Sequence, residues 1–293
     1  MIPAMNIVAW GQFVPWVEQR HVEQDLIISR ALVELFSNAF LREQLRFRGG
    51  TALNKLHFPR PLRYSEDIDL VRTSSGPIGP LLDVVRSTLE PWMGHAQFDQ
   101  SPVAPKLRFR MPAEDQTSPV PIRIKVEINT RETTAYDPPQ MIAFAVESPW
   151  FTGAADIATF SKEEMLATKL RALLQRDKGR DLVDLAHAST VFNDLDATRV
   201  VACFGQYLAA SGHAISRAQA EERMFAKLEN AAFLADVRPL LAADEAAKFD
   251  DKAAHAAFET VFSDFIKRMP GNAWAQTPEM AERFNMPGLA ELG

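Results

Sequence analysis

The sequence predicts an α+β protein, in which a mixed sheet with accompanying helices is followed by an all-helical half. Two patterns predict this order. Before residue 160, apolar and polar residues alternate in several short segments, as they do in half-buried strands. After Ser161, apolar residues recur at helical spacing almost without interruption to about residue 268. We therefore expect an α/β domain with an N-terminal helix over residues 1–160 and a helical C-terminal domain over residues 161–293.

The first predicted element is an amphipathic helix over residues 20–44. The segment LRFRGG is typical of a short strand that ends in a glycine pair, and TALNKLHF is typical of a short helix after it. RYSEDIDLV predicts a second strand, because Ile68 and Leu70 alternate with Asp67 and Asp69. The apolar face of the first helix consists of Val22, Leu26, Val33, Phe36 and Phe40.

A helix over residues 79–92 and four further strands complete the first half. The strands are expected near residues 105–111, 121–129, 141–148 and 154–160. The segment PIRIKVEIN gives the clearest alternation: its isoleucines and valine point one way, and Arg123, Lys125 and Glu127 point the other. The helical half then begins at Ser161, which forms the sequence signature of a capping box with Glu164.

Composition restricts the class of protein and its compartment. The chain has 293 residues, of which 47% are hydrophobic, enough for one large core or two smaller ones. The single cysteine, Cys203, cannot form an internal disulfide or a paired-cysteine zinc site, which favours a reducing compartment. No segment is long and apolar enough to cross a bilayer, and MIPAMNIVAWGQF is not a usual secretory signal. We expect a cytoplasmic protein without membrane contact.

The charge distribution is uneven. The net charge of −6 argues against a nonspecific nucleic-acid binder. The N-terminal motifs nevertheless lie in a basic stretch, whereas the C-terminal region has an excess of acids. A local basic cluster guides polyanions even when the total charge is negative, but scattered arginines on a solvated face explain the same pattern equally well. The bases of the stretch are Arg42, Arg46, Arg48, Lys55, Arg60 and Arg63.

The carboxylates of RYSEDIDLV are the central functional candidates. Asp67 and Asp69 stand two apart on a strand, so both side chains leave the same face. Two acids this close repel each other unless a cation lies between them, and Mg²⁺ prefers carboxylate oxygen and shares substrate phosphates. Glu127, on the polar face of a strand that can lie beside theirs, is the candidate third ligand for a second ion.

The glycine pair before the short helix is a candidate phosphate-binding loop. Gly49 and Gly50 let the backbone approach a phosphate closely, and Thr51 adds a hydroxyl at a helix start. We include Ser65, from the same motif as the aspartates, among the candidate nucleotide-binding residues. Each piece alone has an ordinary structural explanation, namely a turn or a polar edge, but their combination favours a nucleotidyltransferase site.

A second group of candidates opens the helical half, in SKEEMLATKLRALLQRDKGRDLVDL. Lys169, Arg176 and Arg180 recur at helical spacing, and Asp181 and Asp184 begin the next helix after Gly179. We expect Lys169 to neutralise a triphosphate, assisted by Arg176 or Arg180, with one of the two aspartates orienting the lysine. Taken alone, the group is equally typical of a charged helix face with ordinary salt bridges.

Together these motifs resemble the AbiEii/AbiGii family of nucleotidyltransferase toxins, within the DNA polymerase β-like superfamily. FRGGTALNKLHF, RYSEDIDLV, the strand with VEIN and the later EEMLATKLRALLQRDKGRDLVDL carry the resemblance. It implies that Gly49–Thr51 stand at the family's Gly-Ser loop and that Asp67 and Asp69 stand at its D-x-D. It also implies that Lys169 and one of Asp181 or Asp184 stand at its later Lys and Asp. The loop departs from the pattern, because it is Gly-Gly-Thr and lies farther than usual from Asp67.

The resemblance also implies a function. The protein would be the toxin of a bacterial toxin–antitoxin or abortive-infection system. It would transfer a nucleoside monophosphate from an NTP, with Mg²⁺, to the 3′ acceptor end of tRNA. Its partner would be an antitoxin with a winged-helix domain. The alternatives are a small molecule or a protein hydroxyl as acceptor, and a non-catalytic binding module.

Overall fold

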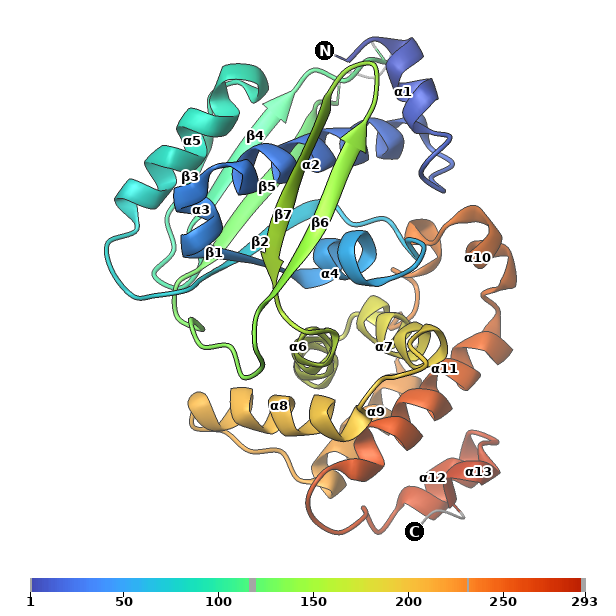
Figure 1. Cartoon of the computed structure of the whole chain (residues 1–293). Coiled ribbons are helices and arrows are strands. Elements are labelled where there is room, and N and C mark those ends of the chain that lie inside the picture. The colour runs from blue at the N-terminus through green and yellow to red at the C-terminus, as the bar shows by residue number, and fades with distance from the viewer. Residues whose placement is uncertain (1, 116–119, 231, 291–293) are drawn as a thin grey trace. The chain divides into compact units, whose positions relative to one another are not determined.

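The chain folds into an α+β structure, which confirms the predicted class. The structure is a computed structural model that describes residues 2–115, 120–230 and 232–290. It divides into two compact units, Met1–Ser161 and Lys162–Gly293. The first contains a mixed seven-stranded sheet and the second contains a run of helices that begins with α6 (Figure 1).

The sheet has the strand order β3-β4-β5-β2-β1-β7-β6. The central pair, β1 and β2, is antiparallel, and each of these strands also has a parallel neighbour, β7 for β1 and β5 for β2. The strands are β1 (Leu45–Arg48), β2 (Asp67–Arg72), β3 (Gln97–Asp99), β4 (Lys106–Met111), β5 (Ile122–Asn129), β6 (Gln140–Glu147) and β7 (Thr152–Thr159).

Helices α2 and α5 accompany the sheet of the first unit (Figure 1). Helix α2 packs against β5, β6 and β7, and its apolar face is fully buried at Leu26, Leu32 and Phe36. The short helix α4 follows β1 directly and packs on β2, so the glycine pair lies at the centre of the sheet. The helices of this unit are α1 (Ala4–Trp10), α2 (Gln19–Ser37), α3 (Ala39–Gln44), α4 (Gly49–Ala52), the π-helical turn η1 (Leu53–His57) and α5 (Gly79–Met93).

The second unit is a helical assembly with an aromatic centre. The rings of Phe225, Phe258 and Phe262 lie within 5.8 Å of one another, and all three side chains are fully buried. Its helices are α6 (Lys162–Gln175), α7 (Gly179–Val191), α8 (Ala197–Ala210), α9 (Arg217–Glu229), η2 (Arg238–Leu240), α10 (Ala243–Lys248), α11 (Asp251–Asp264), η3 (Ile266–Arg268), α12 (Thr277–Arg283) and α13 (Pro287–Ala290).

The predicted elements differ from the structure in a few places. The helix expected over residues 20–44 is two helices, because Asn38 leaves the helical conformation and its side chain accepts the backbone N–H of Leu41 as the N-cap of α3. Helix α1 and strand β3 were not expected, and helices continue beyond residue 268. Within the described ranges, no helix combines the length and the hydropathy needed to cross a membrane.

Candidate active site

Three acidic side chains come together on two neighbouring strands. Asp67 and Asp69 lie on β2, and Glu127 lies on the parallel strand β5. The register pairs Asp69 with Glu127 and Asp67 with Lys125. Because paired residues of adjacent strands point to the same face, the polar faces of β2 and β5 form one acidic surface. The alternation in PIRIKVEIN was sufficient to select Glu127, since its strand does lie beside β2.

Lys125 stands among these acids. Its ammonium lies 3.0 Å from Oδ2 of Asp67 and 3.1 Å from Oε2 of Glu127. Lys106, on β4, approaches the same oxygen of Glu127 at 3.7 Å. The sequence assigned Lys125 to the same face as Glu127 but gave it no role. It is the functional candidate that the sequence interpretation missed, and the signal was its position two residues before Glu127.

The environment of Asp69 favours its protonated form. Burial of its carboxyl, together with the nearby charges of Asp67 and Glu127, raises the pKa of Asp69 to about 6, although Lys125 and Arg48 act in the opposite direction. A cation bound beside this carboxyl would favour its ionised form.

The residues fit a divalent metal by their chemistry. Three carboxylates supply the hard oxygen ligands that Mg²⁺ requires, and the ammonium of Lys125 already lies between two of them as a cation. As the side chains stand, no group of three or more His, Cys, Asp or Glu residues in the described part of the chain is arranged around a metal position.

Gly49 joins the loop to the carboxylates. It adopts a left-handed conformation, with φ of 87°, which side chains disfavour. A Cβ atom added here would overlap the Asp69 carboxylate. A glycine is therefore required at position 49, because it lets the Asp69 carboxylate lie directly against the backbone at the start of α4.

Gly50 and Thr51 join the loop to the segment before β2. A Cβ at Gly50 would stand 2.5 Å from a terminal guanidinium nitrogen of Arg63 and 3.1 Å from Oγ of Ser65. The buried hydroxyl of Thr51 lies 2.5 Å from the backbone carbonyl of Asp67, to which it donates, and 2.8 Å from Oγ of Ser65. The glycine loop and the D-x-D strand are therefore one connected structure.

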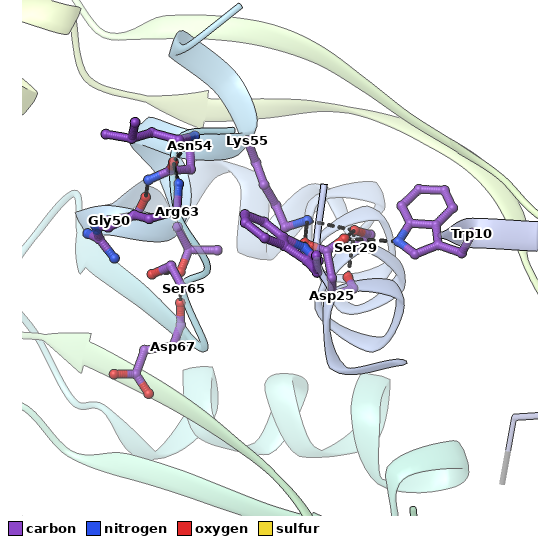
Figure 2. A network of polar contacts seen from close by, with 12 residues as sticks. Trp10, Asp25, Ser29, Gly50, Asn54, Lys55, Arg63, Ser65 and Asp67 are labelled. Carbon is purple, nitrogen blue, oxygen red and sulfur yellow. Dashed lines mark hydrogen bonds and ion pairs between the residues drawn. The ribbon is translucent and has the colours of Figure 1, made fainter. Parts of the chain in front are cut away.

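Asn54, in η1, completes this connection. Its buried amide nitrogen donates to the carbonyl of Gly50 at 2.9 Å, and its oxygen accepts the N–H groups of Leu62 and Arg63 (Figure 2). In the same turn, Lys55 donates to Asp25 of α2 at 2.9 Å. The π-helical turn thus ties the loop to the chain that precedes Asp67 on one side and to α2 on the other.

The second unit contains the other group of candidates. Lys169, on α6, lies 3.2 Å from Oδ1 of Asp181 and 2.8 Å from Oδ2 of Asp184, and both aspartates are fully buried on α7. The sequence left a choice between the two aspartates, whereas the lysine contacts both. The cluster is a buried ion network as it stands.

Arg176 and Arg180 differ in their surroundings. Arg176 lies beyond the end of α6 and donates two hydrogen bonds to Asp181, at 2.8 and 3.1 Å. Arg180 lies in the first turn of α7 and is half-buried. The two arginines therefore do not continue the helix of Lys169, because Gly179 begins a new helix, as the sequence indicated.

The basic stretch is not one exposed surface. Lys55 is 9% exposed and paired with Asp25, and Arg63 is 2% exposed. Arg48 pairs with Glu132 at 2.7 Å. Arg46 is half-buried and donates to the backbone carbonyl of Thr133 at 3.3 Å. Most of the stretch is thus engaged in internal contacts, and Arg60 is its exposed member.

Known proteins share this fold. MenT4, a nucleotidyltransferase toxin from Mycobacterium tuberculosis H37Rv, has a similar structure, with a TM-score of 0.53, 18% sequence identity and coverage of 98% of this chain and 99% of that one. JHP933 from Helicobacter pylori is similar with a TM-score of 0.51 and 14% identity, over 86% of this chain and 95% of that one. At this identity the likeness concerns the fold. No curated protein matches the sequence significantly.

The family is shown by a sequence model. The model described as "Nucleotidyl transferase AbiEii toxin, Type IV TA system" matches residues 30–262, well over half of the chain and including every candidate site residue. The chain therefore belongs to the AbiEii family, the nucleotidyltransferase toxins of type IV toxin–antitoxin systems.

Proposed function

We propose that this toxin transfers a nucleoside monophosphate from an NTP to the 3′ end of an RNA, in particular the acceptor end of tRNA, at the acidic surface of β2 and β5. The observation that carries the proposal is the convergence of Asp67, Asp69 and Glu127 on paired strands beside the glycine loop. A nucleotidyl transfer needs little covalent chemistry from the protein. It needs positioning and neutralisation of charge.

Asp67 and Asp69 would hold Mg²⁺, with Glu127 as the third carboxylate and a ligand of a second ion. When bound, the metal supplies positive charge to the triphosphate and to the oxygens that attack and leave. The chain's own contribution is to fix the carboxylates. Asp69 is fixed against Gly49, and the start of β2 is fixed by the hydroxyl of Thr51.

The glycine loop is the proposed phosphate-binding element. Gly49 and Gly50 open α4 at the end of β1, where backbone N–H groups favour anions. Ser65, half-buried beside Gly50, would contribute its hydroxyl. Thr51 is buried and held by β2, which supports a positioning role for its hydroxyl; a direct contact with phosphate stays a prediction.

Lys169, Arg176 and Arg180 are the proposed cations for the triphosphate. The two carboxylates of Asp181 and Asp184 hold the ammonium of Lys169 in one place, which supports the expected orienting role. We propose that residues 1–160 form the nucleotidyltransferase domain and that residues 161–293 form a helical C-terminal domain, which contains these three side chains.

The test is incorporation of labelled nucleotide. Wild-type protein is incubated with each labelled NTP, Mg²⁺ and total RNA, and the labelled species is identified. Asp69→Ala is expected to abolish incorporation with an unchanged circular dichroism spectrum, because removing this carboxylate removes charge stabilisation worth several kcal/mol in the transition state. Asp99→Ala, on the exposed edge strand β3, is the control and should keep full activity. Full activity of Asp69→Ala would contradict the site assignment.

The acceptor is tested by salt. Binding of an RNA acceptor should weaken as salt rises, since Arg42 and Arg60 would displace counterions from phosphates. Because Lys55 and Arg63 are internal, the accessible basic surface is smaller than the sequence indicated, and this observation keeps a small molecule or a protein hydroxyl as the second candidate acceptor. Labelling that is independent of salt and insensitive to ribonuclease would replace RNA with that candidate.

A type IV toxin implies an antitoxin as counterpart. We propose that the antitoxin carries a winged-helix domain and that the pair acts in the cytoplasm. Co-expression tests this proposal, because growth arrest by the toxin should be relieved by the winged-helix protein and by no unrelated DNA-binding domain.

A further inference from the structure

The ammonium of Lys125 lies between two of the proposed metal ligands, where a metal ion would be expected to bind. Lys125 faces Asp67 in the register between β2 and β5, and its ammonium bridges Asp67 and Glu127 at 3.0 and 3.1 Å. Both contacts are ion pairs, and the contact with Asp67 is also a side-chain hydrogen bond. Lys125 thus balances charge that would otherwise force the two strands apart.

A divalent ion on Asp67 would be opposed by this arrangement. The ion and the ammonium would share one carboxylate, and their positive charges would repel each other. The ion must therefore displace Lys125 from Asp67 or bind weakly.

Lys125 keeps an anchor after displacement. Its second partner, Glu127, is on its own strand, so the ammonium stays at the acidic surface when Asp67 is taken. Its side chain is 24% exposed, which leaves the ammonium accessible to a phosphate oxygen. The triphosphate of an NTP has several negatively charged oxygens, so it can bind the metal ion and the displaced ammonium of Lys125 together.

We propose, on the basis of the function proposed above, that Lys125 is a resident counter-ion that competes with the divalent ion for Asp67. Metal alone then binds weakly, and tight binding requires the nucleotide. The lysine makes the metal site depend on substrate.

The experiment measures Mn²⁺ binding to the nucleotide-free protein, by the loss of the free-ion paramagnetic resonance signal. Lys125→Met removes the charge and keeps the length of the side chain, and it should tighten Mn²⁺ binding about tenfold or more. Lys125→Arg keeps the charge and should bind as weakly as wild type. Lys106→Met is the matched control, because Lys106 approaches Glu127 and not Asp67, and its affinity should change much less.

Lys125→Gln serves as a second neutral variant, measured by the rise in melting temperature on addition of Mn²⁺, in case the methionine variant does not fold. Equal Mn²⁺ affinity in wild type and both neutral variants would overturn the proposal, as would an equal gain in Lys106→Met. If either result is obtained while the wild-type protein transfers nucleotide, the proposed role of Lys125 is wrong and the proposed function still stands. If wild type neither transfers nucleotide nor binds Mn²⁺ with an NTP present, the proposed function fails with it.

Discussion

Two glycines in the first unit have a similar positive φ and different surroundings. Gly49 has φ of 87° and Gly94 has φ of 83°. Nothing lies within 4 Å of a Cβ added at Gly94, whereas the Asp69 carboxylate fills that space at Gly49. A substitution at Gly94 therefore measures the cost of a side chain at positive φ alone, and a substitution at Gly49 adds the cost of displacing the Asp69 carboxylate.

Gly94→Ala is expected to cost about 1 kcal/mol of stability and no activity, because only the left-handed conformation opposes it. Gly49→Ala should cost more and should abolish nucleotide transfer, because Asp69 must move. Urea unfolding and the labelling assay measure the two effects. Similar activity in the two variants would show that the contact between Gly49 and Asp69 is not needed.

The local order of elements was readable from the sequence, and their side-to-side pairing was not. The strands with regular alternation, such as β5, and the glycine pair before α4 follow from local patterns. The pairing of β2 with β5 depends on packing between distant segments, so the contact of Lys125 with Asp67 had no local signal. The sequence left the choice between Asp181 and Asp184 open for the same reason, and in the structure one lysine contacts both.

The π-helical turn η1 is the element that links the glycine loop to the D-x-D strand. Its Asn54 side chain makes three hydrogen bonds, to Gly50, Leu62 and Arg63, in a buried position. Asn54→Ala leaves these backbone groups without their partner and should destabilise the protein by about 2–3 kcal/mol.

The same variant should lower kcat more than it raises KM if the turn positions the loop for the transition state. Asn285→Ala, in an exposed turn of the second unit, is the control for a general effect on folding. An Asn54→Ala protein that is less stable and fully active would assign the turn a purely structural role.

At the scale of the whole molecule, each unit has its own buried charge network. Asp25 and Lys55 pair in the first unit, and Lys169 pairs with two buried aspartates in the second. Burial alone would raise the pKa of Asp181, but the ion pairs with Lys169 and Arg176 outweigh it, and its pKa is lowered from the usual value.

Lys169→Met should destabilise the second unit by about 3–5 kcal/mol, because it removes the ammonium that Asp181 and Asp184 share and leaves Arg176 as the cation beside Asp181. Hydrogen exchange read by mass spectrometry should show faster exchange in α6 and α7 and no change in the sheet. Lys248→Met removes an exposed ion pair and should cost at most about 1 kcal/mol. Loss of activity in Lys169→Met therefore indicates a catalytic role only if Lys169→Arg, which keeps the fold, is also inactive.

The lowered pKa of Asp181 predicts how acid affects the second unit. A carboxyl whose pKa is lower when folded stabilises the fold above its unfolded value and loses that contribution as pH falls through the folded value. Unfolding of the second unit should therefore become easier below about pH 4. In Asp181→Asn this dependence should be weaker, as measured by hydrogen exchange between pH 3 and pH 6. If the pH dependence of hydrogen exchange is the same in Asp181→Asn and in wild type, carboxyl groups other than Asp181 cause it.

The pairing of β5 with β2 also governs when the toxin can first act during its own synthesis. A nascent chain that has emerged only to the end of β2 carries the D-x-D motif and the glycine loop, but not Glu127 or Lys125. The acidic surface is completed only when the ribosome has released residues 122–129, several seconds later at ordinary elongation rates of about 5–20 residues per second. A chain that ends within its first hundred residues therefore lacks Glu127 and Lys125, and the proposed site cannot be completed in such a fragment.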